Sequence, residues 1–253
     1  MIGKLSTSLR KVLELQVEYA RRHGYDLYTY TDNSEQGSDS SHAVHFWKMR
    51  STQYLIESGT TGCDYIFWMD SDAIIMNMSF PLESLIHWDG MEDTDIVVAA
   101  DTLAVNLAQS LWKFSPFSYQ ILEDSWNIGG VVPLVETGAF NAILGGCQPD
   151  HSPEEKVACY KHMDVGWKNR TFAKEYFYPG DNRKIKELVV NKSLLPHIKW
   201  VPKRAINSFP FGLIGGQHRW GDPDFIVHCP GNKGKAEAWL AWIQLFLRFF
   251  PKM

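Results

Sequence analysis

The sequence predicts an α/β protein with a mostly parallel sheet, because apolar strand-like runs alternate with amphipathic helix-like segments along the chain. The chain has 253 residues, of which 45% are hydrophobic and 21% charged, the composition of an ordinary globular protein. No internal repeat or low-complexity tract interrupts this pattern. We therefore expect a single domain over residues 1–253.

The expected elements are assigned from apolar periodicity and from residues that start or stop helices. The first helix begins at Ser6 or Thr7 and ends at Gly24. Two segments lack periodicity, a polar loop at 33–42 and a glycine- and proline-rich stretch at 204–223. An irregular loop as long as the second is often an active-site lid. The other expected helices cover 46–57, 81–86, 117–126, 136–144 and 236–250, and the expected strands cover 25–30, 65–69, 95–100 and 224–228.

Two carboxylates directly follow the buried-type strand YIFWM. Asp70 and Asp72 are separated only by Ser71, and they come where the expected strand ends. Strand ends are where α/β proteins bind ligands. Two adjacent carboxylates ionise together more easily with a cation between them, and a divalent metal with few protein ligands commonly holds phosphate as well. The pair predicts a metal site.

The segment FIVHCPGNKGK offers a second group of candidate ligands. His228 ends an apolar strand, and if that strand is a parallel neighbour of 65–69, His228 lies at the same sheet edge as Asp70. Imidazole is a good ligand for manganese. Gly231 permits close approach of the backbone to phosphate, and Lys233 offers a positive charge for a diphosphate.

Bulk properties exclude several classes of function. The net charge of −4 argues against a broad nucleic-acid-binding surface. No run reaches the length of a transmembrane helix, and the N-terminus lacks the apolar centre of a signal peptide. The four cysteines show no C-x-x-C spacing, which argues against a cysteine zinc site.

The DSD and HCPGNK segments, together with YARRHGYDL, the pair Trp47-Lys48 and INSFP, resemble glycosyltransferase family 34. This family includes galactosyl-, mannosyl- and xylosyltransferases. The resemblance implies a GT-A fold, a Rossmann-like mixed sheet flanked by helices. It also implies a UDP- or GDP-sugar donor, a glycan acceptor, Mn²⁺ (with Mg²⁺ as the alternative) and retention of anomeric configuration. By position, Asp70, Asp72 and His228 match the family's metal ligands, and Lys233 matches its donor-diphosphate lysine.

Two departures from the family pattern stand out. Family members carry an acid followed by glutamine beside the sugar, whereas this chain has Val135-Glu136-Thr137, so that only the acid is kept. Family members also have a strand before the first helix, and this chain begins on the helix. One interpretation is an N-terminally incomplete version of a longer protein, with the anchor and stem missing too.

The resemblance also implies a mechanism. The acceptor hydroxyl would attack the donor sugar on the same face from which the leaving group departs. Asp72 would act through the metal. Glu136 would orient the donor sugar or stabilise positive charge at its anomeric carbon. Ser71, Gly231 and Asn106 are further candidates for donor contact, although asparagine after a strand is often only a turn residue. Three aromatic side chains near the irregular segment could stack on a sugar, namely Phe209, Phe211 and Trp220.

Two alternative functions remain open at this point. A D-x-D at a strand end also opens the haloacid-dehalogenase-type phosphatases, although their motif continues differently from Ala73-Ile74. A non-catalytic glycosyltransferase-like subunit would fit the missing glutamine, and complexes with other glycosyltransferases are an expected setting. The resemblance implies the lumenal side of the Golgi membrane. Asn77, Asn169 and Asn191 would be potential glycan acceptors there, but Asn77 lies so close to the metal motif that we do not expect its modification.

Overall fold

The protein is described by a computed structural model and divides into two compact units. Unit 1 comprises Met1–Thr29, Met69–Pro81 and Arg204–Met253, and unit 2 comprises Tyr30–Trp68 and Leu82–Lys203. The expected single domain over 1–253 stays a prediction. The structure describes residues 7–30, 44–59, 62–87, 94–101, 104–133, 135–171, 183–208 and 224–228.

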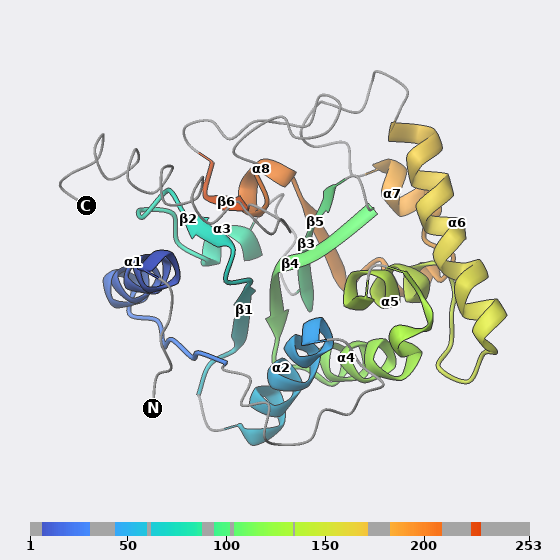
Figure 1. Ribbon diagram of the computed structural model, residues 1–253, viewed down its shortest axis with the longest axis horizontal. Helices are drawn as coiled ribbons and strands as arrows, with labels where there is room; N and C mark the ends of the chain where they lie inside the picture. The colour runs from blue at the N-terminus through green and yellow to red at the C-terminus, as the bar shows by residue number, and fades with distance from the viewer. Residues whose placement is uncertain are drawn as a thin grey trace. The chain divides into compact units, whose positions relative to one another are not determined.

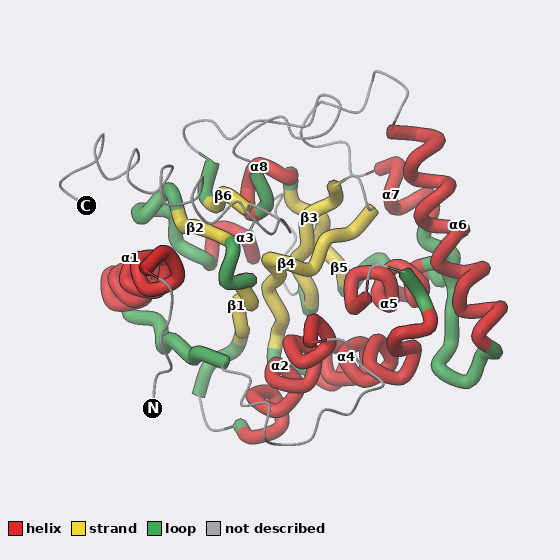
Figure 2. The backbone as a smooth tube through the Cα atoms, in the orientation of Figure 1, coloured by secondary structure: helices red, strands yellow, loops and turns green. Residues whose placement is uncertain are grey.

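Helices and strands alternate along the described residues (Figures 1 and 2). The α-helices are α1 (Thr7–His23), α2 (Trp47–Ser58), α3 (Glu83–Ile86), α4 (Pro116–Ile128), α5 (Val135–Leu144), α6 (Pro153–Thr171), α7 (Arg183–Leu188) and α8 (Lys203–Ile206). The strands are β1 (Tyr65–Met69), β2 (Ala73–Ile75), β3 (Ile96–Asp101), β4 (Ala104–Lys113), β5 (Ile198–Val201) and β6 (Ile226–His228). Three short 3₁₀ turns are η1 (Val44–Phe46), η3 (Gly129–Val131) and η5 (Lys192–Leu194).

The main sheet is mixed, in the strand order β1-β4-β3-β5. Strand β5 runs parallel to β3, whereas β4 runs antiparallel to it, with Asp101 opposite Ala104. The mixed α/β fold is therefore confirmed, but the expectation of a mostly parallel sheet is wrong for β4. Only residues 102 and 103 separate β3 from β4, and so short a connection permits a hairpin but no parallel crossover.

Unit 2 has an apolar core between the sheet and its helices. Helix α5 packs on β4, and it is flanked by α4 and α6 (Figure 1). The largest fully buried side chains of this core include Trp112, Phe140 and Trp200. Gly138 lies where a side chain has no room, because a Cβ there would be 1.7 Å from the carbonyl oxygen of Pro133.

Helices α2 and α4 are joined by a polar cluster at their interface. The Arg50 guanidinium and the Gln53 amide both donate to the Glu123 carboxylate. The Arg50 guanidinium also lies over the Trp126 ring, 4.4 Å from its centroid, in cation–π geometry. The cluster thus combines charge, hydrogen bonding and stacking at one contact.

In unit 1, helix α1 packs on a small two-stranded sheet. Strands β2 and β6 pair antiparallel, with Ala73 opposite His228. From α1, the Tyr19 hydroxyl donates to the carbonyl oxygen of Phe80, and its ring contacts Phe225. The expectation that the His228 strand lies parallel beside β1 is wrong, because β6 pairs with β2 instead.

Several other expected elements differ from the structure. Residues 25–30 form no strand, and Lys203–Ile206 is a short helix rather than loop. Strand β4 and helix α6 were not expected. The remainder of the expected lid, at 209–223, and the C-terminal aromatic helix lie outside the described residues.

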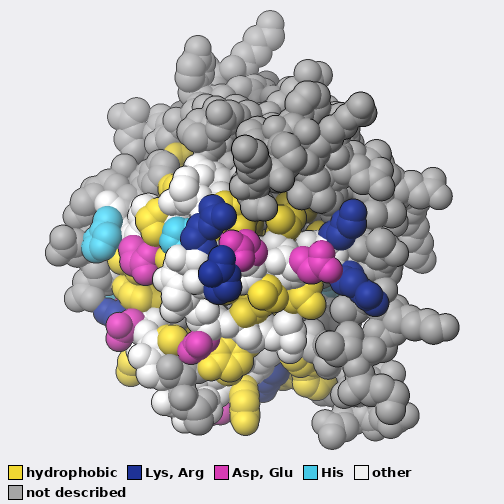
Figure 3. Space-filling view, turned by 90° about the vertical axis from the view of Figure 1, so that its left-hand side faces the viewer, with side chains coloured by type: hydrophobic (Ala, Val, Ile, Leu, Met, Phe, Trp, Pro, Cys, Tyr) yellow, Lys and Arg dark blue, Asp and Glu magenta, His cyan; other side chains and the backbone are white. Residues whose placement is uncertain are grey.

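Within the described part of the chain, no single helix is both long and apolar enough to cross a membrane, and only the bent pair Pro116–Val131 with Val135–Leu144 meets that test when combined. On the face shown in Figure 3, acidic and basic side chains of the described residues are interspersed rather than segregated. On α1, the Glu18 carboxylate forms ion pairs with Arg21 and Arg22.

Candidate functional site

The Asp70-Ser71-Asp72 segment forms the turn between β1 and β2. The backbone N–H of Ala73 donates to the Asp70 carbonyl oxygen, at 3.1 Å, and closes the turn. Ser71 is exposed and Asp70 is half-buried, while the Asp72 side chain is 38% exposed. The turn therefore holds both carboxylates in place while leaving Asp72 accessible to a ligand.

Strand β6 brings His228 to this turn. One ligand atom each from Asp70, Asp72 and His228 lies within 4.8 Å of the others. The His228 Nε2 atom is 3.3 Å from Asp72 Oδ1. The antiparallel pairing of β2 and β6 explains the approach, since His228 lies opposite Ala73, directly after the turn.

Asn207 fixes the orientation of the His228 ring. Its Oδ1 atom lies 2.7 Å from His228 Nδ1 and, as an amide oxygen, can only accept a hydrogen bond there, so that Nε2 is the ring nitrogen that faces Asp72. His228 and Asn207 are both buried. A carbonyl oxygen behind a histidine in this way is typical of metal-binding histidines, whose second nitrogen is usually hydrogen-bonded.

The segment that carries Asn207 is itself anchored on β6. The N–H of Ser208 donates to the carbonyl oxygen of Ile226, and the N–H of His228 donates to the carbonyl oxygen of Ser208. The Ser208 hydroxyl donates to Asp224 at 2.7 Å. Sequence reasoning gave Asn207 no role. Its place in the INSFP segment was the one signal that could have singled it out.

The three side chains fit a hard or borderline divalent cation. Two carboxylate oxygens with one imidazole nitrogen is a donor set suited to Mn²⁺, and less so to Mg²⁺, which prefers oxygen alone. These three residues, taken from the described part of the chain, would leave other coordination positions for phosphate oxygens or water. Their role as metal ligands stays a prediction.

Glu136 lies in the first turn of α5, in unit 2, and forms a buried ion pair. The Lys48 Nζ atom of α2 is 2.8 Å from Glu136 Oε1, and each side chain is 7% exposed. The preceding residue, Val135, has φ +54°, which is strained for a β-branched residue. Such strain often occurs at functional sites, although the predicted role of Glu136 in catalysis is not tested by it.

Asn106 lies within β4, not after a strand as expected from the sequence. It is buried, and its Oδ1 atom accepts the Ala108 N–H at 2.8 Å. Because the residue pattern of 104–113 does not predict a strand, Asn106 was expected after a strand rather than within one. Contact with the donor stays a prediction.

The other predicted donor and sugar contacts lie outside the described residues. These are Gly231, Lys233, Phe209, Phe211 and Trp220.

Comparisons with known proteins agree with this architecture. The model of the galactosyl transferase GMA12/MNN10 family matches residues 3–238, which is most of the chain. A solved structure described as a glycosyltransferase involved in the glycosylation of the major capsid of PBCV-1 is similar in fold, with a TM-score of 0.55 and 16% identity, over 96% of each chain. No curated protein matches the sequence. The expected fold class, a GT-A-type mixed α/β fold, is confirmed.

Proposed function

Because the chain belongs to the galactosyl transferase GMA12/MNN10 family, a family of glycosyltransferases, we propose that it is a metal-dependent, retaining enzyme. It would move a hexosyl or pentosyl unit from a UDP- or GDP-sugar to a glycan acceptor. The observation that carries the proposal is the convergence of Asp70, Asp72 and His228, whose ligand atoms lie within 4.8 Å of one another.

Each residue would have a separate task in this reaction. Asp70, Asp72 and His228 would hold Mn²⁺, with Ser71 beside them in the turn. When bound, the cation neutralises charge that builds up on the departing nucleoside diphosphate. Lys233 would add a positive charge at the same oxygens, and Gly231 would let the backbone approach them.

Retention is proposed to follow from attack on the face from which the leaving group departs. Glu136 would orient the donor sugar or stabilise positive charge at its anomeric carbon, without forming a covalent bond. Asn106 would contact the sugar or the acceptor. The anomeric configuration of the first product, measured by NMR, tests this part, since inversion would exclude it.

The test of the whole proposal is a screen of nucleotide sugars for Mn²⁺-dependent hydrolysis, with the Asp72→Asn variant beside wild type. We expect the variant to keep its fold and to lose metal-dependent turnover. Asp26→Asn is a matched control, because Asp26 is an exposed carboxylate in the same unit that lies outside the three-residue group. Equal hydrolysis by Asp72→Asn and wild type would remove Asp72 from the mechanism.

Donor affinity tests the predicted diphosphate contact. Lys233→Ala should weaken donor binding by about 1.5–3 kcal/mol, the contribution of a charged hydrogen-bond partner. Unchanged affinity in calorimetry would contradict the role of Lys233. Binding without turnover in wild-type protein would favour the alternative of a non-catalytic subunit, and phosphatase activity is the less favoured alternative because the family is one of glycosyltransferases.

We also propose that the protein works on the lumenal side of the Golgi membrane, in complexes with other glycosyltransferases. The Asn191 sequon suits glycosylation there, and its asparagine Oδ1 atom accepts from the Ser193 hydroxyl at 2.7 Å. A mass shift on glycosidase treatment that disappears in Asn191→Gln would support lumenal exposure, and its absence in wild type would count against it.

A further inference from the structure

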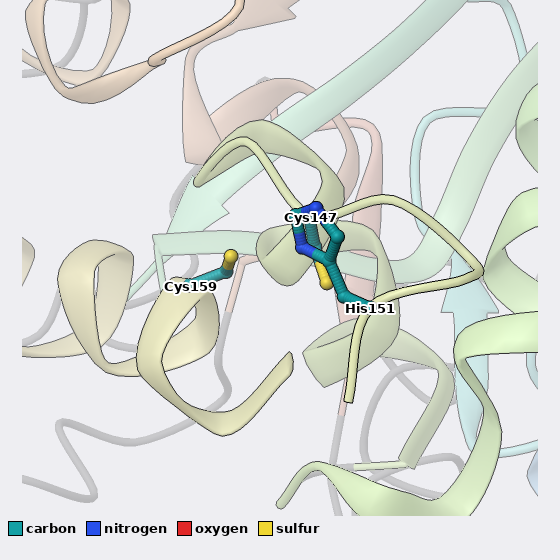
Figure 4. A group of neighbouring side chains, drawn as sticks. All are labelled: Cys147, His151 and Cys159. Carbon is teal, nitrogen blue, oxygen red and sulfur yellow. The ribbon is translucent and has the colours of Figure 1, made fainter. Parts of the chain in front are cut away.

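A second group of potential metal ligands lies in unit 2, formed by Cys147, His151 and Cys159. One ligand atom from each lies within 4.8 Å of the others. Figure 4 shows that Cys159 projects from α6 toward the loop that carries Cys147 and His151. Their order in the sequence, C-x₃-H-x₇-C, is not a standard zinc spacing, so only the fold reveals the group.

The loop from α5 to α6 fixes Cys147 beside Cys159. Gly146 has φ +91°, and the N–H of Cys147 bonds back to the carbonyl oxygen of Ala142, which ends α5 and starts the loop. At Gly145, a Cβ would be 2.3 Å from the carbonyl oxygen of Cys159. The two backbones therefore approach closely at the place where the thiols meet.

His151 is folded back onto Cys147 by a tight turn. The His151 N–H donates to the carbonyl oxygen of Gln148, with Pro149 at the second position that suits such a turn. Immediately afterwards, Ser152 and Glu155 form a capping box, in which the Ser152 N–H donates to the Glu155 carboxylate at 2.8 Å and the Glu155 N–H donates to the Ser152 hydroxyl. The whole loop is therefore organised by local hydrogen bonds.

We propose that Cys147, His151 and Cys159 bind a Zn²⁺ ion, with a fourth position open to water. A tetrahedral zinc ion holds sulfur at about 2.3 Å and nitrogen at about 2.0–2.1 Å, so that two bound sulfurs lie about 3.8 Å apart. Ligand atoms already within 4.8 Å of one another need only a small inward movement. His151 is half-buried, which leaves a side of the group open to solvent.

The three ligands themselves suit a zinc ion rather than a manganese ion. Two thiolates with a neutral imidazole give a zinc complex without net charge, and thiolate ligands select zinc over manganese. Because the thiolate is the ligand form of cysteine, binding of the ion would displace one proton from each of the two thiols.

The site would tie the end of α5 to the second turn of α6. Helix α5 begins at Val135 and carries Glu136, so the ion would brace the helix that presents this residue. This role is separate from the proposed manganese site, whose three ligands contain no sulfur.

Cobalt substitution provides the test, because Co²⁺ replaces zinc and gives a thiolate-to-metal charge-transfer band. Metal-stripped, reduced protein should develop this band on titration, saturating at roughly one ion per chain, and zinc should abolish it. Cys147→Ser and Cys159→Ser should lose the band, and His151→Asn should weaken cobalt binding. Cys63→Ser and Asp72→Asn should keep it, since neither residue belongs to this group.

Wild-type protein gives the decisive result, independently of whether any variant folds. Roughly one equivalent of zinc retained through gel filtration, measured by mass spectrometry of the metal, supports the site. Folded, reduced protein that shows no band overturns it, as does a band that persists in Cys159→Ser. A Cys147–Cys159 disulfide in protein purified without reductant, with no zinc bound, would also overturn it.

Discussion

Lys48 on α2 and Glu136 on α5 form an ion pair almost wholly removed from solvent, with Nζ 2.8 Å from Oε1. The Lys48 Nζ atom also lies 6.0 Å from the centroid of the Trp68 ring. Burial of a carboxylate is costly unless a partner compensates it, and Lys48 provides this partner and holds the Glu136 side chain in one position. Glu136, the acid that matches the family pattern, is therefore held by Lys48, which lies 88 residues earlier in the chain, in the first turn of α2.

Removal of Lys48 should destabilise the protein strongly. In Lys48→Met the Glu136 carboxylate loses its buried cation, and we expect the free energy of unfolding to fall by about 3–5 kcal/mol. The double variant Lys48→Met with Glu136→Leu should recover much of this loss, because neither charge remains. Urea denaturation with circular dichroism measures both. Arg21→Ala, which breaks an exposed pair on α1, serves as the control and should change little.

Asn207 should act on the candidate metal site through His228. Asn207→Leu removes the acceptor that holds the His228 Nδ1 proton, so Mn²⁺ affinity should fall roughly ten- to hundredfold. Asn207→Asp keeps an acceptor at the same place and should retain most of the affinity. Manganese titration followed by electron paramagnetic resonance compares the two. Equal affinity of wild type and Asn207→Leu would show that the ring needs no such support.

The sequence predicts the strand-end cluster because its elements are local. Residue type and periodicity predict each of these elements, namely the YIFWM run, the two aspartates after it and the short strand ending in His228. The pairing that brings these elements together was predicted wrongly, because β6 pairs with β2 and not with β1. The pairing of β6 with β2 depends on the three-residue strand Ala73–Ile75, which is too short to show a period, and Asn207 acts through one hydrogen bond across 21 positions.

Strand β4 escaped prediction for a different reason. Its residues AVNLAQSLWK interrupt the apolar pattern with Asn106, Gln109 and Ser110, which are all buried. Two of them have specific partners, since the Asn106 Oδ1 atom accepts the Ala108 N–H and the Ser110 hydroxyl accepts from the Trp112 indole, both at 2.8 Å. Likewise, the Cys147, His151 and Cys159 group follows from the packing of α5 on α6, which no spacing rule encodes.

Glu123 should make stability depend on pH in the acid range. The hydrogen bond from Gln53, together with those from Arg50 and Asn127, lowers the pKa of Glu123 below its ordinary 4.5. The unfolded chain therefore binds a proton at a higher pH than the folded protein does. The stabilising contribution of the ionised Glu123 carboxylate is complete above pH 4.5, and it is lost as the pH falls through the lowered pKa. Glu123→Gln should thus lose stability at neutral pH but approach wild type in acid.

The neighbouring Asp124 provides a control of opposite sign. Burial raises the pKa of Asp124 above its ordinary 3.8, so ionisation at higher pH opposes folding. The free energy of unfolding of Asp124→Asn, relative to that of wild type, should therefore be higher at neutral pH than in acid. Urea midpoints from about pH 7 to about pH 3 measure both variants. The same pH trend in both would contradict the assignment to these two carboxyl groups.

Asn141 on α5 should prove essential for the docking of this helix on β4. Its amide nitrogen donates to the carbonyl oxygen of Val105, and its Oδ1 atom accepts the Val105 N–H, both at 3.2 Å. The side chain thus satisfies both backbone polar groups of a buried strand residue, a task that an apolar side chain cannot perform.

Asn141→Leu leaves these two backbone groups buried without this partner. Each such group costs about 1–3 kcal/mol, so we expect a loss of about 2–4 kcal/mol in the free energy of unfolding. The amide proton of Val105 should also exchange faster with solvent, which hydrogen exchange by NMR detects at that single position. Gln120→Ala removes an exposed contact with Asp124 on α4 and should alter stability by less than about 0.5 kcal/mol. If Asn141→Leu matched this control and left the Val105 amide protected, α5 would be held on the sheet by apolar packing alone.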